Sequence, residues 1–446
     1  MKRLIVRLAA KLRELSGDGK VVRNISWLFL DRVLRLGVGL VVWSWMARYL
    51  GAESFGLLNF AIALFVMFSV VAGLGLHDVV VRNLVHEDAA RRETLGSAAL
   101  LLLLGAVIAY FLLLLTIFVL RPEDKEAIYL VAIIGGMVFF KPAEIAAYWF
   151  ESQVQSKYTV WAQNFAFLFF AGIKAALILF EAPLVAFAWA TFLESLSAAL
   201  LLLAFFNRRA VRLSVLKIQV RKIRALLSDS WQLLAAGLAT ILYMKIDQIM
   251  VGQMKGNEAV GVYSAAVRIS EVWYFVPLAI VASNFPAVLD ARARGDDGQY
   301  YRLIQRLYDV AVWLCLAVAV PMTFLSDLIV GVLFGSAYSA AGPILTIHIW
   351  GSVFVFLGYV STRWFIAENR QVLTMQRTFL GAALNVTLNF VLIPRFGGLG
   401  AATATVISYA VANLVFDVFQ GETKRMFAMK LHTIAPSRLH GYLRRT

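Results

Sequence analysis

The sequence predicts an all-α polytopic membrane protein of about 12 transmembrane helices in two six-helix lobes. Of its 446 residues, 61% are hydrophobic and 15% are charged, whereas about 25% of residues are charged in soluble globular proteins. The hydrophobic residues lie in runs of about 20, the length that crosses a bilayer. The pattern G-x-E-x-x-G occurs at residues 51–56 and again 205 residues later at 256–261, each time between the first two runs of its half. These observations indicate two copies of one membrane unit.

Twelve apolar runs are long enough to span a membrane. Segments rich in glycine, proline and charge separate them, such as RPED at 121–124 and PRFGG at 394–398, and these residues end helices. The first run is long enough to span, so no cleavable signal peptide is expected. The runs cover roughly 24–47, 55–76, 94–119, 127–150, 158–180, 184–206, 229–253, 262–288, 303–325, 342–366, 372–394 and 398–420.

Lysine and arginine are distributed unevenly over the connections between the runs. If the N-terminus is cytoplasmic, the inner segments hold 31 of the 42 basic residues, the outer segments hold five, and six lie inside the runs. Cytoplasmic connections of membrane proteins carry an excess of lysine and arginine. Both termini are therefore predicted to be cytoplasmic. The net charge of +15 is explained by topology, and no nucleic-acid partner is needed to account for it.

The most basic internal connection, 207–228, separates two groups of six runs. Because six is even, both groups start on the same side of the membrane. The lobes are then related by a pseudo-two-fold axis along the membrane normal, with a substrate cavity between them. The predicted parts are a basic amphipathic segment at 1–23, an N-lobe at 24–206, a basic cytoplasmic linker at 207–228, a C-lobe at 229–420 and a basic cytoplasmic tail at 421–446.

Two connecting segments bear on function. Residues 2–16 alternate apolar and basic residues at helical spacing, which indicates either a helix on an anionic membrane surface or a frayed basic tail. The longest outer connection, near 326–341, is too short for a catalytic domain.

Charged side chains inside the runs are the main functional signal, because each central charge costs at least about 2.5–3.5 kcal/mol on insertion scales. Such residues face an aqueous cavity or a partner. Three local pairs share a helix face, but Lys174 has no local acid and needs a partner on another helix or an anionic ligand. The six cations are Arg32, Arg35, Lys141, Lys174, Lys245 and Arg268. The acids are Asp31, Glu144, Glu194, Asp247, Glu271 and Asp417, and the local pairs are Asp31–Arg35, Lys141–Glu144 and Arg268–Glu271.

Two interpretations of these charges are open. The cations form a rough ladder from the inner to the outer third of the membrane, which suits the crossing of an anionic phosphate head group. Alternatively, the charges are mutually neutralised pairs that hold the helices together. Asp247 and Glu144 are the acids best placed for coupling to protons or sodium ions, and the alternative for Asp247 is a salt bridge with Lys245 or Arg268. Asp31 and Glu271 are kept as candidates for either role.

No motif predicts an enzyme. The sequence lacks a Walker A motif, G-x-S-x-G and H-E-x-x-H. Its five histidines are scattered, and its single cysteine, Cys315, lies within an apolar run, so no metal site or disulfide framework is expected. No cofactor is predicted beyond a coupling ion.

Several stretches resemble one family of membrane proteins, the Wzx-type polysaccharide or O-antigen flippases. Their superfamily (the MOP superfamily) includes the MATE exporters and the lipid II flippases. The resemblance covers nearly all of the chain as a pattern of glycines, an aspartate and apolar runs. It is carried by MARYLGAESFGLLNFAIAL at 46–64, GLGL at 73–76, KIDQIMVGQMKGNEAVGVYSAAVRI at 245–269, NFP at 284–286 and NVTLNFVLIPRFGGLGAATATVIS at 385–408.

This resemblance implies a function in polysaccharide export, including lipopolysaccharide biosynthesis. Such proteins move an undecaprenyl-pyrophosphate-linked oligosaccharide between leaflets of the bacterial inner membrane by alternating access through a cationic cavity. Asp247 matches an acidic position near the end of the seventh span, and Arg268 a basic position in the eighth. The implied partners are this glycan lipid, membrane lipids and other polysaccharide-assembly membrane proteins.

Three other functions were weighed against this one. A MATE-type ion-coupled drug antiporter is the main alternative, although a cavity for cationic drugs should be lined mainly by acids. A polymerase or ligase of the O-antigen should carry a long outer loop with catalytic residues. A structural scaffold would not explain six costly cations inside the runs.

Overall fold

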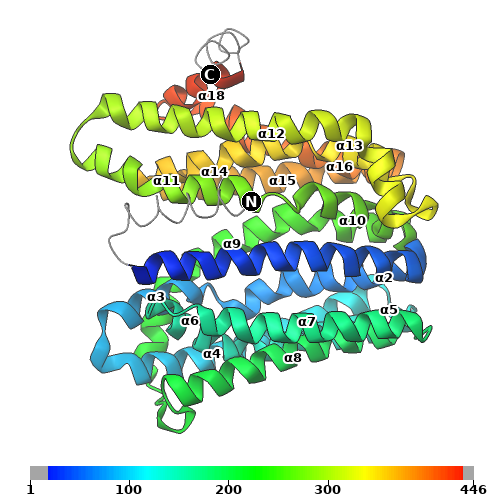
Figure 1. The fold of residues 1–446 in the computed structure, drawn as a ribbon, viewed down its shortest axis with the longest axis horizontal. Helices are drawn as coiled ribbons and strands as arrows, with labels where there is room; N and C mark the ends of the chain where they lie inside the picture. Colours follow the sequence, from blue (N-terminus) through cyan, green and yellow to red (C-terminus); the bar gives the residue numbers. More distant parts are fainter. Residues whose placement is uncertain (1–18, 435–446) are drawn as a thin grey trace. The chain divides into compact units, whose positions relative to one another are not determined.

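The protein is described here by a computed structural model that covers residues 19–434. Within this range the chain is helical and contains no strand (Figure 1). The amphipathic segment predicted at 2–16 lies outside the described residues, as does the end of the predicted tail from 435 onward. The predicted all-α membrane architecture is confirmed by eleven helices that are long and apolar enough to cross a membrane in the described part.

The chain divides into two compact units. Unit 1 comprises the chain up to Leu50 together with Ala61–Leu238, and unit 2 comprises Gly51–Phe60 together with Ala239 and the residues that follow. Helices α2 (Gly19–Gly73) and α9 (Val220–Lys255) contribute to both units. The lobe boundaries expected from the sequence and the pseudo-two-fold relation between lobes stay predictions.

Unit 1 contains the remaining helices of the first half of the chain. Two clusters of buried apolar side chains form its core, around residues such as Leu102, Phe150 and Phe206, and around Ala106 and Val138. Its elements are α3 (Leu76–His86), η1 (Asp88–Ala90), α4 (Arg91–Leu120), α5 (Lys125–Gly135), η2 (Gly136–Ala143), α6 (Glu144–Ser152), α7 (Lys157–Leu179), α8 (Leu184–Arg209) and η3 (Leu213–Val215).

Unit 2 contains the helices of the second half. Its core gathers aromatic side chains such as Tyr300, Tyr308 and Phe356. Its elements are α10 (Asn257–Glu271), α11 (Phe275–Ala293), α12 (Asp297–Phe334), η4 (Ser336–Tyr338), α13 (Ala341–His348), α14 (Gly351–Ala367), α15 (Gln371–Phe396), α16 (Gly398–Ala410), η5 (Val411–Val415), α17 (Phe416–Phe419) and α18 (Lys424–Ile434).

The long apolar helices fall where the sequence predicts spans, with two differences. The first two predicted spans form one helical stretch, α2, which is interrupted at Gly51 by a non-helical backbone (φ 73°, ψ 169°) that glycine adopts without steric cost. In addition, α12 continues to Phe334. The prediction of an outer loop near 326–341 is therefore wrong over most of that range. Its apolar residues Leu328 to Leu333 extend the helix rather than forming a connection.

Several spans change helix type part of the way along. The stretch Lys125–Ser152 consists of α5, the 3-10 segment η2 and α6. Gly135 ends α5 and Gly136 begins η2, which also contains Pro142, a residue without an N–H donor. Another span contains a π-helical turn, η5, between α16 and α17. Segments of 3-10 and π-helix are frequent where helices carry functional residues.

The two copies of G-x-E-x-x-G pack against each other within unit 2. A side chain at Gly56 would collide with the backbone of Asn257 and Gly261, and a side chain at Gly261 would collide with the backbone of Ala52. The close approach is therefore reciprocal: the last glycine of each copy contacts the backbone of the other. This contact explains why Gly51–Phe60 belongs to unit 2 although it lies in the first half of the chain.

Candidate functional site

The cations predicted inside unit 1 are held by carboxylates of the same unit. Lys174 on α7 lies with its Nζ 2.7 Å from Oε2 of Glu194 on α8, so its partner is on another helix. Lys141 on η2 lies 2.8 Å from Oε1 of Glu144, as the i,i+3 spacing predicts. Both lysine side chains are largely withdrawn from solvent, being 14% and 21% exposed.

Arg35 joins two helices of unit 1. Its Nε lies 2.8 Å from Oδ1 of Asp31 on the same helix, which is the i,i+4 pair that the sequence predicts. The guanidinium also donates to Oδ1 of Asn164 at 3.2 Å and lies over the ring of Phe167, both on α7. The charged side chain of Arg35, on the first predicted span, therefore contacts the fifth predicted span. Arg32, in contrast, is exposed.

One cation predicted inside unit 2 contacts a carboxylate on another helix. Lys245 on α9 lies 3.4 Å from Oε2 of Glu271 on α10, a contact that local sequence spacing does not predict. Arg268 itself is exposed. Lys141, Lys174 and Lys245 thus each contact a different carboxylate.

Asp247 lies in an uncharged polar cluster rather than in a salt bridge. It is 3% exposed, and no ion pair among residues 19–434 includes it, so the salt bridge with Lys245 or Arg268 weighed above is not formed. Its Oδ2 accepts the hydroxyl hydrogen of Tyr263 and lies 3.5 Å from Oγ1 of Thr405. Its Oδ1 accepts the backbone N–H of Gln248 at 2.7 Å.

Two asparagines of α15 extend this cluster. Asn385 donates to Oγ1 of Thr405 at 3.3 Å, and Asn389 donates to Oδ1 of Asn385 at 3.0 Å. Both asparagines are fully buried, and Oδ1 of Asn389 has no hydrogen-bond partner among the described atoms. We call this group the Asp247 cluster; its members are Asp247, Tyr263, Thr405, Asn385 and Asn389. Four helices of unit 2 contribute oxygen atoms to it, and hard cations prefer oxygen ligands.

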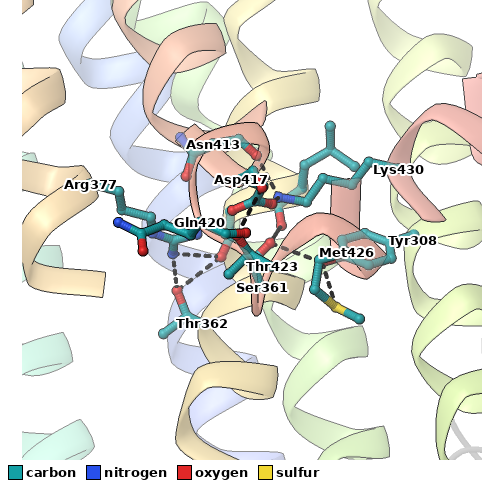
Figure 2. A network of polar contacts seen from close by, with 12 residues as sticks. Tyr308, Ser361, Thr362, Arg377, Asn413, Asp417, Gln420, Thr423, Met426 and Lys430 are labelled. Atoms are coloured by element: carbon teal, nitrogen blue, oxygen red, sulfur yellow. Dashed lines mark hydrogen bonds and ion pairs between the residues drawn. The ribbon is translucent and has the colours of Figure 1, made fainter. Parts of the chain in front are cut away.

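A second buried charge cluster lies at α18 (Figure 2), and the sequence analysis identified only its acid, Asp417. Lys430 and Asp417 are both fully buried, and Nζ of Lys430 lies 2.6 Å from Oδ2 of Asp417. Nearby Arg377 is 4% exposed and donates to the carbonyl of Gly358 at 3.0 Å and to Thr362 at 2.5 Å. Burial lowers the pKa of Lys430 from 10.5 to about 8, although Asp417 opposes part of that shift.

The sequence shows one member of this cluster, Asp417, as an acid of a predicted span, but it does not show the partners of that acid. Lys430 lies in a segment that reads as a solvated basic tail, and Arg377 lies where a span was expected to meet the cytoplasm. Only the packing of α18 against α12 and α17 encloses them. Among the scattered histidines, His77 lies with its ring 2.8 Å from Asp78 and 3.0 Å from Glu151 of α6.

The charges of the described residues permit two kinds of chemistry. A lysine held by one carboxylate can exchange that partner for another anion, and phosphate oxygens are strong acceptors for lysine. A buried carboxylate without a cationic partner can bind a proton or a small cation, because its charge is otherwise costly. The first kind fits Lys141, Lys174 and Lys245, and the second fits Asp247.

Solved structures with the same fold come from two groups of transporters. The chain is similar to the lipid II flippase MurJ in an inward closed conformation, with a TM-score of 0.72 and 15% identity over 93% of this chain and 91% of that one. It is similar to an inward-facing multidrug resistance MATE transporter of the MOP superfamily, with a TM-score of 0.70 and 15% identity over 91% and 99%. At this identity the likeness concerns the fold alone.

Curated relatives match a part of the chain. The probable low-salt glycan biosynthesis flippase Agl15 of Haloferax volcanii is 27% identical over 221 residues, 49% of this chain and 46% of the relative. The probable flippase AglR of the same organism is 31% identical over 180 residues, 39% and 37%. The matches thus span less than half the length of these relatives.

Family models extend the match. The MatE model matches residues 233–391. The model described as polysaccharide biosynthesis protein matches residues 21–292, which is more than half of the 446 residues. The chain therefore belongs to the polysaccharide biosynthesis protein family.

Proposed function

We propose that this protein is a flippase that moves a lipid-linked glycan across a membrane, and that it is a transporter rather than an enzyme. The observation that carries the proposal is the placement of Lys141, Lys174 and Lys245 in apolar spanning helices, each against a single carboxylate. Membership of the polysaccharide biosynthesis family and the flippase names of the relatives support it. Placing a charged lysine inside a membrane costs free energy unless the lysine contacts a charged partner or a substrate.

The finer proposal is that the cargo is an undecaprenyl-pyrophosphate-linked oligosaccharide, an O-antigen repeat unit or a related one. A diphosphate carries the acceptor oxygens that can replace Glu144, Glu194 and Glu271 on the three lysines. Arg32, Arg35 and Arg268 complete the proposed path for the head group. In this proposal the membrane is the bacterial inner membrane. The distribution of lysine and arginine favours an orientation with both termini in the cytoplasm.

Binding of the head group tests this proposal. Purified protein in detergent is incubated with undecaprenyl diphosphate, with and without a glycan, at two salt concentrations. We expect wild type to bind, salt to weaken binding, and Lys174→Ala/Arg268→Ala to lose it. Arg294→Ala is the matched control, because it removes an exposed cation that is paired with Asp290. Equal binding by the double variant and the control would contradict the proposal.

We also propose that the Asp247 cluster couples transport to a proton or sodium gradient. Its buried carboxylate has no cationic partner among the described residues, and the free Oδ1 of Asn389 supplies a further oxygen in the same cluster. Ion binding is expected to raise the melting temperature of the detergent-solubilised protein, because a ligand that binds only the folded state stabilises it.

The test compares melting temperatures in sodium chloride and in choline chloride, and across pH. Wild type is expected to be stabilised by sodium or by acidification, whereas Asp247→Asn is expected to respond to neither. Asp290→Asn removes an exposed carboxylate and should behave as wild type. An unchanged response in Asp247→Asn would exclude the cluster as the coupling site.

The alternative function is an ion-coupled drug antiporter of the MATE type. It is favoured by the match of residues 233–391 to the MatE model and by the buried acid Asp247. Under this alternative, organic cations should bind to the purified protein, whereas undecaprenyl diphosphate should not.

A further inference from the structure

We infer that a hydrated polar column inside unit 2 carries the coupling proton from the Asp247 cluster to the buried ion pair at α18. The inference rests on the proposed ion coupling at Asp247, and it adds the identity of the ion and its route toward the cytoplasm. Polar side chains of α9, α15, α16, η5, α17 and α18 build the column. Beyond the Asp247 cluster, its members are Tyr243, Tyr409, Asn413, Arg377, Asp417 and Lys430.

One wall of the column is a face of α15. Arg377, Gly381, Asn385 and Asn389 follow one another at intervals of four residues, and all four are buried. Residues four apart are neighbours on a helix surface, so this buried face carries a guanidinium and two amides where apolar side chains would be expected. From Arg377 to Asn389 it extends about 18 Å at 1.5 Å per residue, which is more than half of the hydrocarbon thickness of about 30 Å.

The second wall runs along α16, η5 and α17. Thr405, Tyr409 and Asp417 are each at most 2% exposed, and Asn413 of η5 follows Tyr409 by four residues. In a regular α-helix eight residues turn through about 800°, which would leave about 80° between Tyr409 and Asp417. The π-helical turn η5 takes up an extra residue. It thereby reduces this angle and keeps both polar side chains toward the inside of unit 2.

Tyr243 of α9 fills the middle of the column. It precedes Asp247 by four residues on the same helix face, and its ring packs on that of Tyr409 with the centroids 4.7 Å apart. Gly381 makes room for this ring, because a side chain there would approach Tyr243 to 2.7 Å. The charge of Arg377 acts on the Tyr243 hydroxyl. Tyr243 therefore connects the level of the Asp247 cluster with the level of Arg377.

Buried polar atoms that have no hydrogen-bond partner among the described residues occur along the whole column. They are Oδ1 of Asn389 at one end, the hydroxyl of Tyr243 in the middle, and Nη1 of Arg377 and Oδ1 of Asp417 at the other end. Buried polar groups without a protein partner are usually hydrogen-bonded to ordered water. A row of such groups indicates a row of water molecules, and water and hydroxyl groups in a row can pass a proton.

Lys430 forms the end of the column at α18. Its ammonium group donates to the carbonyl of Asn413 and to Oδ2 of Asp417, each at 2.6 Å (Figure 2). Because α18 follows the last spanning helix, this end lies at the cytoplasmic side in the predicted topology. Burial lowers the pKa of Lys430 to about 8, although Asp417 opposes part of that shift, and Arg377 and Tyr308 are the other ionisable groups around it. Lys430 can therefore release and bind a proton near neutral pH.

The column suits a proton better than a metal ion. A sodium ion would have to pass Arg377 and Lys430, whose charges repel it, and it would need oxygen ligands at every step. A proton moves by exchange, because each water or hydroxyl accepts one hydrogen and gives up another and ends unchanged. Lys430 releases a proton to cytoplasmic water and takes one from the column. The proton that leaves the carboxyl group of Asp247 is thus matched by one that enters the cytoplasm.

X-ray footprinting of the wild-type protein in detergent tests whether the column is hydrated. Radicals formed from bound water oxidise the side chains beside it, and the oxidised residues are identified by mass spectrometry. Tyr409 is 2% exposed, and Tyr338 of η4, which is not part of the column, is 0% exposed, so bulk water reaches neither ring. We expect Tyr409 to be oxidised at least fivefold faster than Tyr338. Equal rates would indicate a dry column and overturn the inference.

Proton transfer is tested in vesicles that contain a pH-sensitive dye, the protein and glycan-linked undecaprenyl diphosphate in sodium-free buffer. We expect proton movement with wild type and movement at least fivefold slower with Tyr243→Phe. This variant removes only a hydroxyl without a protein partner, so its melting temperature should equal that of wild type. The control Tyr110→Phe removes a hydroxyl of α4 in unit 1, which donates to the carbonyl of Ala132, and it should leave proton movement unchanged.

The outcomes distinguish the column from the proposed coupling site and from the proposed function. If Asp247→Asn stops proton movement while Tyr243→Phe is as fast as wild type, the column is wrong and the coupling site stands. If Asp247→Asn moves protons as wild type does, the coupling site fails. Transport of the glycan lipid that requires sodium would identify sodium as the ion and overturn the inference. If no glycan lipid moves with or without sodium, the proposed function fails.

Discussion

At the scale of single residues, the three lysines predicted inside the spans are paired with carboxylates. Lys141, Lys174 and Lys245 each lie within 3.4 Å of a carboxylate. A paired lysine costs less to bury than an isolated one, because the partner supplies Coulomb energy and a hydrogen bond. The pairing alone is compatible with a structural role, so the functional role must be separated from it by experiment.

Single and double substitutions of Lys174 and Glu194 distinguish a structural role of this pair from a role in transport. Lys174→Met leaves the carboxylate of Glu194 without its partner and should lower the melting temperature, because breaking a buried pair costs roughly 3–5 kcal/mol. Lys174→Met/Glu194→Met removes both charges and should recover most of that loss. Transport of the glycan lipid in vesicles should be lost in the single variant and stay lost in the double variant.

The exposed pair of Asp290 and Arg294 serves as the control for that cycle. Its single and double methionine variants should change the melting temperature little, because exposed pairs contribute about 0–1 kcal/mol and both side chains are more than half exposed. If the double variant at Lys174 and Glu194 restored transport together with stability, Lys174 would be a structural partner only.

At the scale of secondary-structure elements, the contact between the two G-x-E-x-x-G copies leads to a prediction for their glycines. Gly56→Ala and Gly261→Ala each place a methyl group against backbone atoms that cannot rotate away. Overpacking of this kind typically costs 1–3 kcal/mol, so both variants should lower the melting temperature by several degrees.

Gly172→Ala is the control for these variants, because the same methyl group on α7 would meet nothing within 4 Å. Alanine is also the better helix former, by roughly 1 kcal/mol, so Gly172→Ala should be neutral or stabilising. A melting temperature of Gly56→Ala equal to that of the control would mean that the two copies do not pack tightly.

The docking of α18 predicts a pH dependence. The pKa of Lys430 in the folded protein is about 8, below its ordinary value of 10.5. Between these pH values the unfolded state binds more protons than the folded state, so this group makes stability rise with pH from about 8 to 10.5. Below pH 8 its effect on stability is constant. Asp417, Arg377 and Tyr308 are the other ionisable groups around it.

Thermal unfolding of wild type and of Asp417→Asn/Lys430→Met between pH 7 and pH 10 measures this effect. The variant removes both members of the ion pair, and Arg377 keeps its hydrogen bonds to the carbonyl of Gly358 and to Thr362. Its melting temperature is expected to rise less with pH above 8 than that of wild type. Parallel pH profiles for the two proteins would show that Lys430 does not titrate in this range.

The sequence predicts elements better than sites, for a physical reason. Apolar runs such as 94–119 are visible because the bilayer requires about 20 apolar residues for a span, and α4 covers Arg91–Leu120. Local pairs such as Lys141 with Glu144 are visible because helical spacing places them together. The partners Lys174–Glu194 and Lys245–Glu271 are 20 and 26 residues apart, and only the packing of helices determines them.

At the scale of the whole molecule, the G-x-E-x-x-G repeat and the basic connections together predict which side of the membrane each connection faces. An even number of spans between the two copies puts residues 51–56 and 256–261 on the same side of the membrane. The excess of lysine and arginine in the alternate connections makes that side the outer one. Lys255 should then face the outside, and Arg294 the cytoplasm.

Single cysteines test this claim, and the chain suits the method because its one cysteine, Cys315, is buried. In a Cys315→Ala background, Lys255→Cys should react with a membrane-impermeant maleimide in intact cells, whereas Arg294→Cys should react only after the membrane is opened. Both positions are exposed, so failure to react reports sidedness and not burial. Labelling in the reverse order would invert the topology and would place the basic connections 207–228 and 289–302 outside, against the charge rule on which the orientation rests.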